Sequence, residues 1–257
     1  VTLQATNDIT VDAGIDASGN ATGRALTLQA GHDVVINAAL TTASAGGGSL
    51  ILSAGNNVIV GHALTANGGS LILSAGNNVT VGAALTANGG SVSLIADNDG
   101  TGPGLSGGTV SFVAVTATNL SIRFNPVDYT TTTAEIATYA PKATLTGTFD
   151  ARAWTFIDNA SATAQDRAYD GSTVATLDVP FALKSAPDGV TVGQRVDLAA
   201  GNANFNSKNV SATTVSFTGY ALVSTLASAD VDFYALFSQP VSLTASITAK
   251  ALTATIV

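Results

Sequence analysis

The sequence has 257 residues, of which 46% are hydrophobic and only 10% are charged. This apolar content is enough for one large or two medium folded domains and argues against intrinsic disorder. Nine Lys and Arg against seventeen Asp and Glu give a formal net charge of −8, which argues against a nucleic-acid partner. No apolar run approaches the roughly 18 residues of a spanning helix, so we expect no membrane insertion.

Related sequence units fill the first part of the chain. The clearest are SLILSAGNNVIVGHALTANGG (49–69) and SLILSAGNNVTVGAALTANGG (70–90), which differ at Ile59/Thr80 and His62/Ala83. The first apolar triplets of the five units are Val1-Thr-Leu3, Leu26-Thr-Leu28, Leu50-Ile-Leu52, Leu71-Ile-Leu73 and Val92-Ser-Leu94. Each unit alternates apolar and polar residues between Gly, Asn and Asp turns, which predicts three short strands. Three strands enclose a core only when units stack, so we predict a right-handed parallel β-helix with about 21 residues per coil.

The turn after the first predicted strand contains two polar columns. The first column is Asn7, His32, Asn56, Asn77 and Asn98, and the second is Asp8, Asp33, Asn57, Asn78 and Asp99. Stacked Asn side chains bond to equivalent residues above and below, and Asn tolerates the left-handed backbone of tight turns. We therefore interpret the second column as a structural ladder, and His32 as one polar turn residue among five.

Composition changes after the repeats. Residues 1–110 contain 20 of the 26 glycines and no aromatic residue, whereas all fifteen aromatic residues lie between Phe112 and Phe237. We expect 1–126 to form the β-helix with a C-terminal cap, 127–160 a linker or small β element, and 161–257 a β-sandwich-like module. No segment has a helical period, so an all-β chain is predicted. Trp154 and Phe156 are expected to pack on the cap.

Two parts of the sequence resemble segments of one protein family. The 21-residue units resemble the haemagglutinin-type repeats of two-partner-secretion exoproteins, which are filamentous-haemagglutinin-like bacterial adhesins. RAYDGSTVATL (167–177), NFNSKNVSATTVSFTGYAL (204–222) and SQPVSLTASITAKALT (238–253) resemble the MBG/YDG modules of the same exoproteins. This resemblance implies an extracellular stalk or adhesive fibre, and it supplies no catalytic residue.

A catalytic role is the alternative to this structural interpretation. Lyase chemistry on acidic sugars needs a basic side chain beside calcium-holding carboxylates, and the five units contain only Arg24. Asp8 and Asp33 are neighbours in one column and could serve as the carboxylate pair of a glycosidase. Their alignment with Asn57 and Asn78 favours the ladder. We therefore predict a protein that is not an enzyme, with no catalytic and no cofactor-binding residues.

The sequence contains few candidate metal ligands. DNDG at 97–100 resembles the start of a calcium loop, so Asp97 and Asp99 are weak calcium candidates, although an ordinary turn is the preferred interpretation. His32 and His62 fall at different places in their units, and the chain has no cysteine. We therefore predict no zinc site and no cofactor, with calcium at Asp97 and Asp99 as the one candidate left open.

The sequence thus favours a structural, adhesive role: a segment of a secreted or cell-surface bacterial adhesin or fibre that supports adhesion or biofilm. Expected partners are further modules of the same polypeptide or copies joined end to end, with surface glycans or exopolysaccharide as further candidates. Two alternatives stay open. One is a self-assembling filament subunit in which a strand of 241–257 is added to a neighbour. The other is a carbohydrate-binding or carbohydrate-cleaving β-helix.

Overall fold

The chain is mostly β-structure, with 53% of residues in strands and 7% in helices. The computed structural model describes residues 1–19, 23–43, 47–100, 108–126, 129–184, 196–224 and 230–251. These divide into two compact units. The first contains Val1–Trp154 and Asp232–Ala235, and the second contains Thr155–Ser185, Thr191–Val231 and Leu236–Val257, each where described.

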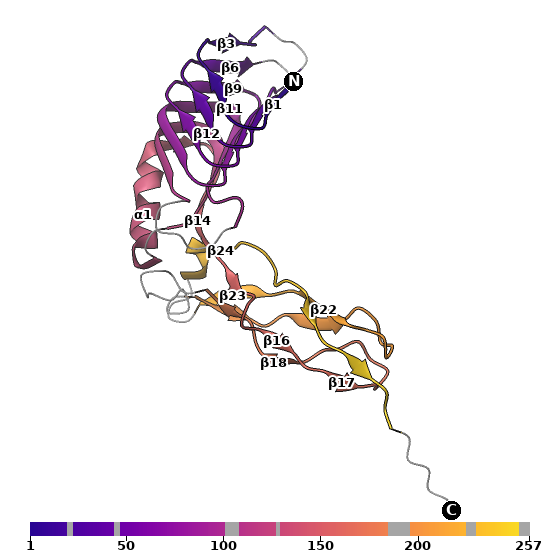
Figure 1. Ribbon diagram of the computed structural model, residues 1–257. Helices are drawn as coiled ribbons and strands as arrows, with labels where there is room; N and C mark the ends of the chain where they lie inside the picture. Colours follow the sequence, from indigo (N-terminus) through magenta and orange to yellow (C-terminus); the bar gives the residue numbers. More distant parts are fainter. Residues whose placement is uncertain are drawn as a thin grey trace, which may run out of the picture. The chain divides into compact units, whose positions relative to one another are not determined.

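The first unit is a parallel β-solenoid of about five turns (Figure 1). Its first column of strands is β1, β4, β7 and β10, which continues into β11, β12 and β14. The strands of the repeats are β1 (Thr2–Ala5), β2 (Ile9–Val11), β3 (Ile15–Asp16), β4 (Leu26–Ala30), β5 (Val34–Ile36), β6 (Leu40–Ala43), β7 (Leu50–Ala54), β8 (Val58–Val60), β9 (Leu64–Asn67), β10 (Leu71–Ala75), β11 (Val79–Ile95) and β12 (Val110–Phe124). Each pairs in parallel with its equivalent in the next turn, which is the repeat arrangement that the sequence predicts.

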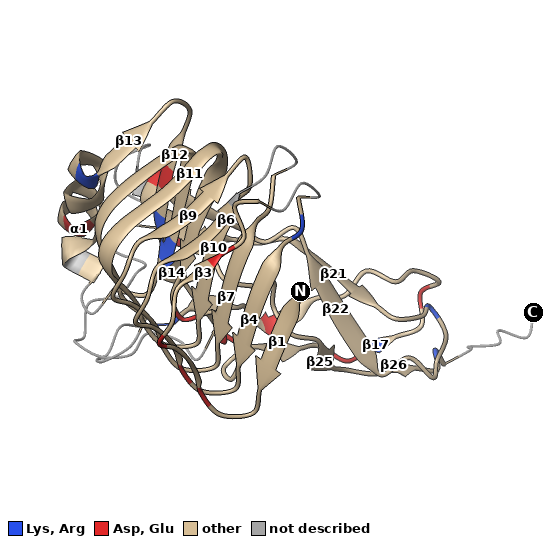
Figure 2. Cartoon of the chain, turned by 90° about the horizontal axis from the view of Figure 1, so that it is seen from above, with Lys and Arg blue, Asp and Glu red and all other residues tan. Residues whose placement is uncertain are grey.

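The register keeps equivalent side chains in line through the core. Leu28, Leu52, Leu73 and Leu94 occupy successive turns and are fully buried. The second and third strands of each turn form similar columns, such as Val34, Val58 and Val79. Outward positions between them are apolar or neutral polar, such as Ile51, Ile59 and Thr80, and few charged segments lie on the stacked strands (Figure 2). Like residues therefore stack on like residues, so each added turn extends one continuous core.

A short helix closes the second strand column, contrary to the prediction of a chain without helices. β12 is followed by η1 (Tyr129–Thr131), α1 (Thr132–Tyr139), η2 (Ala140–Lys142), β13 (Ala143–Leu145) and β14 (Phe149–Thr155). The Tyr139 ring stacks on Phe112 with ring centroids 5.6 Å apart, and its hydroxyl lies 3.2 Å from the Val110 carbonyl. α1 thus covers the end of this column, where another strand would otherwise pair.

Sequence periodicity missed α1 because the helix has eight residues and a weakly amphipathic pattern. Its buried side chains are Thr132, Ile136 and Tyr139. Trp154 and Phe156, which were both expected to pack on the cap, belong to different units. Trp154 donates its indole N–H to the Ala96 carbonyl at 3.0 Å within the first unit, whereas Phe156 stacks on Phe237 in the second.

One carboxylate is held between two arginines beside the last turn. Asp150 Oδ2 lies 2.6 Å from Arg123, and its Oδ1 lies 2.8 Å from Arg152. Partial burial opposes ionisation of Asp150, but the hydrogen bonds and charges of Arg152 and Arg123 outweigh it, so the pKa of this carboxyl is lowered. The group is about two-fifths exposed, so solvent screening keeps the stabilisation below roughly 1 kcal/mol.

This ion group predicts a pH-dependent effect of Asp150→Asn. Because the folded-state pKa is lowered, the stabilisation is complete above the unfolded-state value of about 3.9 and is lost as pH falls through the folded-state value. We expect the variant to melt a few degrees lower at pH 7, and this difference to shrink progressively as the pH falls below about 3.9. Melting curves measured from neutral to acidic pH follow the difference, and a gap that does not change with pH would contradict the ionic origin.

The second unit is built from short paired strands. They are β15 (Ile157–Asp158), β16 (Thr163–Ala164), β17 (Arg167–Ala168), β18 (Leu177–Val179), β19 (Ala182–Leu183), β20 (Val196–Ala199), β21 (Asn202–Phe205), β22 (Thr214–Thr218), β23 (Ala221–Ser224), β25 (Leu243–Thr244) and β26 (Ile247–Thr248). The pairing is antiparallel except for β17 with β26. Phe181, Phe217 and Tyr220 pack edge to face in its apolar core.

Two remaining elements lie late in the chain, and part of one prediction falls outside the described residues. η4 (Asp230–Phe233) leads into β24 (Tyr234–Leu236), which follows β14 in the strand order of the solenoid sheet. The segment proposed for strand addition, 241–257, contains β25 and β26, while 252–257 lie outside the described residues.

Candidate functional site

The turns between the first and second strands stack through backbone hydrogen bonds. His32 N–H donates to the Asn7 carbonyl at 3.0 Å, Asn56 N–H to His32 at 2.8 Å, and Asn77 N–H to Asn56 at 2.7 Å. These turns lie on the outside of the solenoid and present their polar side chains to solvent. The solenoid thus lines up one side chain per turn at a repeat distance set by strand pairing.

Side chains add a second ladder along the same turns. Asp8 Oδ1 accepts the Asp33 N–H at 3.0 Å, Asp33 Oδ1 accepts the Asn57 N–H at 2.8 Å, and Asn57 Oδ1 accepts the Asn78 N–H at 3.3 Å. The next rung is Thr109, whose N–H and hydroxyl both donate to Asn78 Oδ1 at 3.0 and 2.8 Å. The structure therefore brings together four of the five predicted ladder residues and places Thr109, not Asp99, after Asn78.

The reason for this shift lies in the turn after β11. The Asp97 N–H donates to the Asn77 carbonyl, so Asp97 takes the place that the alignment gave to Asn98. Asp97 has a positive φ of 52°. The next rung of the side-chain ladder is Thr109, so the register of the sequence alignment does not hold beyond Asp97.

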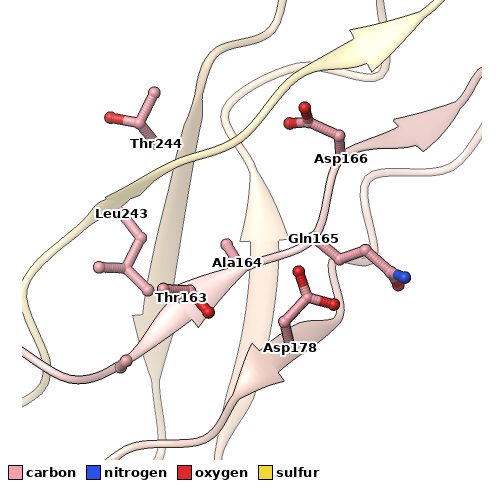
Figure 3. Close-up of a pocket in the computed structure, with 8 residues that line it drawn as sticks. Thr163, Ala164, Gln165, Asp166, Asp178, Leu243 and Thr244 are labelled. Carbon is pink, nitrogen blue, oxygen red and sulfur yellow. The ribbon is translucent and has the colours of Figure 1, made fainter.

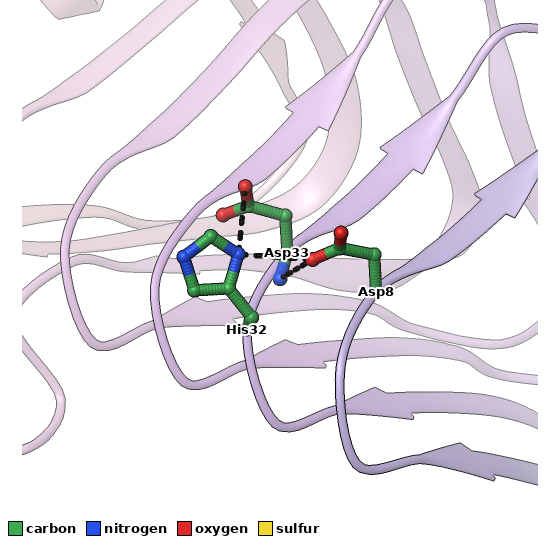
Figure 4. Close-up of side chains that lie close together, drawn as sticks. All are labelled: Asp8, His32 and Asp33. Carbon is green, nitrogen blue, oxygen red and sulfur yellow. Dashed lines mark hydrogen bonds and ion pairs between the residues drawn. The ribbon is translucent and has the colours of Figure 1, made fainter.

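The same turns bring one imidazole between two carboxylates (Figure 4). His32 Nδ1 lies 2.9 Å from Asp8 Oδ1 and 3.2 Å from Asp33 Oδ2. His32 Nε2 lies 3.2 Å from Asn56 Nδ2, and Asn56 Nδ2 also donates to Asp33 Oδ1 at 2.9 Å. The exposed fractions of the three side chains are 53% for His32, 44% for Asp8 and 21% for Asp33, so solvent reaches the group. We name these three residues the Asp–His–Asp cluster.

Hydrogen bonds favour the ionised form of Asp8. The Asp33 backbone N–H contributes most, and the His32 side chain adds to it; together they lower the pKa of the Asp8 carboxyl. Asp8 is therefore a carboxylate at neutral pH and faces the imidazole. Among the described residues, this cluster is the one group of three or more His, Cys, Asp or Glu side chains whose ligand atoms lie within 4.8 Å of one another.

The weak calcium candidates occupy different surroundings. Asp97 is almost fully buried, and its Oδ2 accepts the Asn125 side-chain amide at 3.1 Å. Asp99 is placed near Gly76, since a Cβ added to that glycine would lie 3.4 Å from Asp99 Oδ2. Residues 101–107 of the same loop lie outside the described residues. Calcium binding at Asp97 and Asp99 stays a prediction.

The second unit carries a hollow of about 530 Å³ (Figure 3). Its lining residues are Ala162, Thr163, Ala164, Gln165, Asp166, Asp178, Leu243 and Thr244. One carboxylate oxygen of Asp166 is used in a structural hydrogen bond, because Asp166 Oδ1 accepts the Ser246 backbone N–H at 2.5 Å. Its described lining contains two carboxylates, Asp166 and Asp178, and neither a basic side chain nor a histidine.

Comparison with known proteins gives no relative for this chain: no family model, no curated protein and no solved structure matches it. Among the helices of the described residues, none is long and apolar enough to cross a membrane. The fold therefore defines a parallel β-solenoid of about five turns joined to a second unit of short strands.

Proposed function

We propose that this chain is a non-catalytic structural segment of a secreted or cell-surface bacterial adhesin or extracellular fibre, supporting adhesion or biofilm formation. The observation that carries the proposal is the in-register repetition. Residues 49–69 and 70–90 form successive turns in which nearly every side chain stacks on its identical counterpart. An active site gathers unlike residues at one point, whereas this repetition builds length and a uniform surface.

The finer features of the proposal follow the sequence resemblance. They are a right-handed solenoid, a β-sandwich-like MBG/YDG module in 161–257, and partners that are further modules of the polypeptide or copies of the chain. In support, the first unit buries a continuous apolar core along its length, and the second has a separate core around Phe181, Phe217 and Tyr220. Two units, each with its own apolar core, suit a modular extracellular segment.

Surface display tests this function. We expect a non-adherent bacterium displaying the full chain on an outer-membrane anchor to retain more cells on glass or plastic under flow than the anchor alone. The matched control is Leu73→Asp, which disrupts the solenoid, displayed at equal density as measured by antibody. Attachment equal to that of the anchor alone would contradict the adhesive role. Products released from a panel of neutral and acidic polysaccharides would contradict the non-catalytic one.

A further inference from the structure

We propose that the Asp–His–Asp cluster (Asp8, His32 and Asp33) is a binding site for a divalent transition-metal ion of the zinc type, joining the first two turns of the solenoid. The inference goes beyond the proposed function and does not depend on it. It starts from an irregularity in the ladder. The third and fourth turns place neutral Asn56, Asn57 and their equivalents at these positions, whereas the first two turns place two acids and an imidazole.

The ladder itself does not require these charged residues. Asn57 Oδ1 accepts the Asn78 N–H just as Asp33 Oδ1 accepts the Asn57 N–H, so an amide is sufficient for the turn. Replacing amides by Asp8 and Asp33 brings two negative charges to adjacent turns of one column. A cation between them offsets the repulsion, and the imidazole supplies the nitrogen ligand that transition metals favour.

The distances suit such an ion. Ligands at the bond lengths of tetrahedral zinc, about 2.0–2.2 Å, lie roughly 3.3–3.6 Å from one another. His32 Nδ1 lies 2.9 Å from Asp8 Oδ1 and 3.2 Å from Asp33 Oδ2, and all three ligand atoms lie within 4.8 Å of one another. Small side-chain rotations at this partly exposed surface open these separations to the required values. Water completes the coordination.

Neighbouring residues fix the carboxylate that lies deeper. Asp33 Oδ1 accepts from the Asn57 N–H, Asn56 Nδ2 and Asn57 Nδ2 at 2.8, 2.9 and 3.1 Å, which leaves Oδ2 directed at His32. Metal binding at His32 Nδ1 places the imidazole proton on Nε2, 3.2 Å from the Asn56 amide group. The Asn56 amide keeps its bond to Asp33 Oδ1, so water at this exposed face accepts the Nε2 proton, as it does for many metal-bound histidines.

Ligand type separates zinc from calcium. Calcium takes six to eight oxygen ligands and rarely an imidazole, whereas zinc combines His nitrogen with carboxylate oxygen. We therefore expect zinc to bind at pH 7 and calcium not to replace it.

Isothermal titration of the full chain with zinc at pH 7 tests the site. We expect one saturable site per chain in wild type. His32→Asn restores the residue found at Asn56 and Asn77, so it keeps the ladder, and we expect it to weaken zinc binding at least about tenfold, or about 1.4 kcal/mol. His62→Asn is the matched control, because it removes the other histidine outside the cluster, and we expect it to bind as wild type does.

A second measurement separates metal binding from folding. Circular dichroism and melting without zinc should be alike for wild type, His32→Asn and His62→Asn. Added zinc should then raise the melting temperature of wild type and His62→Asn and leave His32→Asn unchanged. Three results would overturn the proposal: no saturable binding up to millimolar zinc, unchanged affinity in His32→Asn, or equally tight binding of calcium.

Discussion

Leu73→Asp is expected to unfold the solenoid. Leu73 lies at the centre of β10 and is fully buried, stacked between Leu52 and Leu94 in the neighbouring turns. The substitution removes a buried leucine side chain and places a charge among apolar neighbours without a partner. Loss of the leucine alone costs about 3–5 kcal/mol and a buried unpaired charge adds several more. The sum approaches the whole stability of a typical domain.

The matched control for this prediction is Ile59→Asp. Ile59 lies on β8 between the buried Val58 and Val60, but its side chain points outward and is 40% exposed. The next turn already has Thr80 at this position. We expect Ile59→Asp to shift the free energy of unfolding by less than about 0.5 kcal/mol.

Chemical denaturation followed by circular dichroism measures both variants. The expected result is a folded Ile59→Asp chain and a Leu73→Asp chain that has lost most of its strand signal in the absence of denaturant. Equal stability of the two variants would mean that Leu73 is not a core residue, and the register of the stacked turns would be wrong.

The solenoid could be predicted from sequence because its repeats encode the register directly. Leu3, Leu28, Leu52, Leu73 and Leu94 align in the sequence and pair in the structure, since each turn repeats both the strand pattern and the turn residues. Where the repeat ends, the prediction lost accuracy. The helix α1 lies beyond the last repeat, and the rung at Thr109 follows the interruption after Asp97; local pattern does not say which residue continues a column there.

The Asp–His–Asp cluster was only half visible in the sequence. Alignment placed Asp8 and Asp33 in one column and His32 in the adjacent one, so the proximity of the three residues could be predicted from the sequence. The direction of the imidazole could not be predicted, because it depends on which side of the turn the ring occupies. The structure turns Nδ1 of His32 toward both carboxylates, which column position alone does not specify.

In the second unit, the β-structure was expected from the sequence, but the pairing of its strands was not. β17 pairs in parallel with β26 across about eighty residues, and β22 pairs with both β21 and β25. Such long-range partners are chosen by side-chain packing around Phe205, Phe217 and Ile247, and no repeated motif records that packing in the sequence.

Gly55→Ala is expected to weaken the stacking of turns. A Cβ built on Gly55 would lie 2.2 Å from the Gly31 carbonyl oxygen, and one on Gly76 would lie 2.2 Å from the Gly55 carbonyl oxygen. The added methyl group would meet rigid backbone of the preceding turn. The Gly55 N–H donates to the Ala30 carbonyl at 3.1 Å, so relief of the clash stretches this and neighbouring hydrogen bonds. We expect destabilisation of about 3 kcal/mol.

Gly61→Ala is the matched control, in the same turn of the solenoid and at a similar exposed bend. A Cβ on Gly61 would lie 3.4 Å from the Ile36 carbonyl oxygen, an ordinary contact, and its φ is not positive. The first two turns have Asp12 and Asn37 at this position, so a side chain fits. Alanine also restricts the unfolded chain, so we expect Gly61→Ala to be neutral or to stabilise by up to about 1 kcal/mol. Urea denaturation of both variants measures the change in the free energy of unfolding. If only Gly55 lies in close contact with the preceding turn, Gly55→Ala lowers this free energy and Gly61→Ala does not. Equal changes in both variants would show that glycine flexibility, and not the spacing between turns, explains the glycine at both positions.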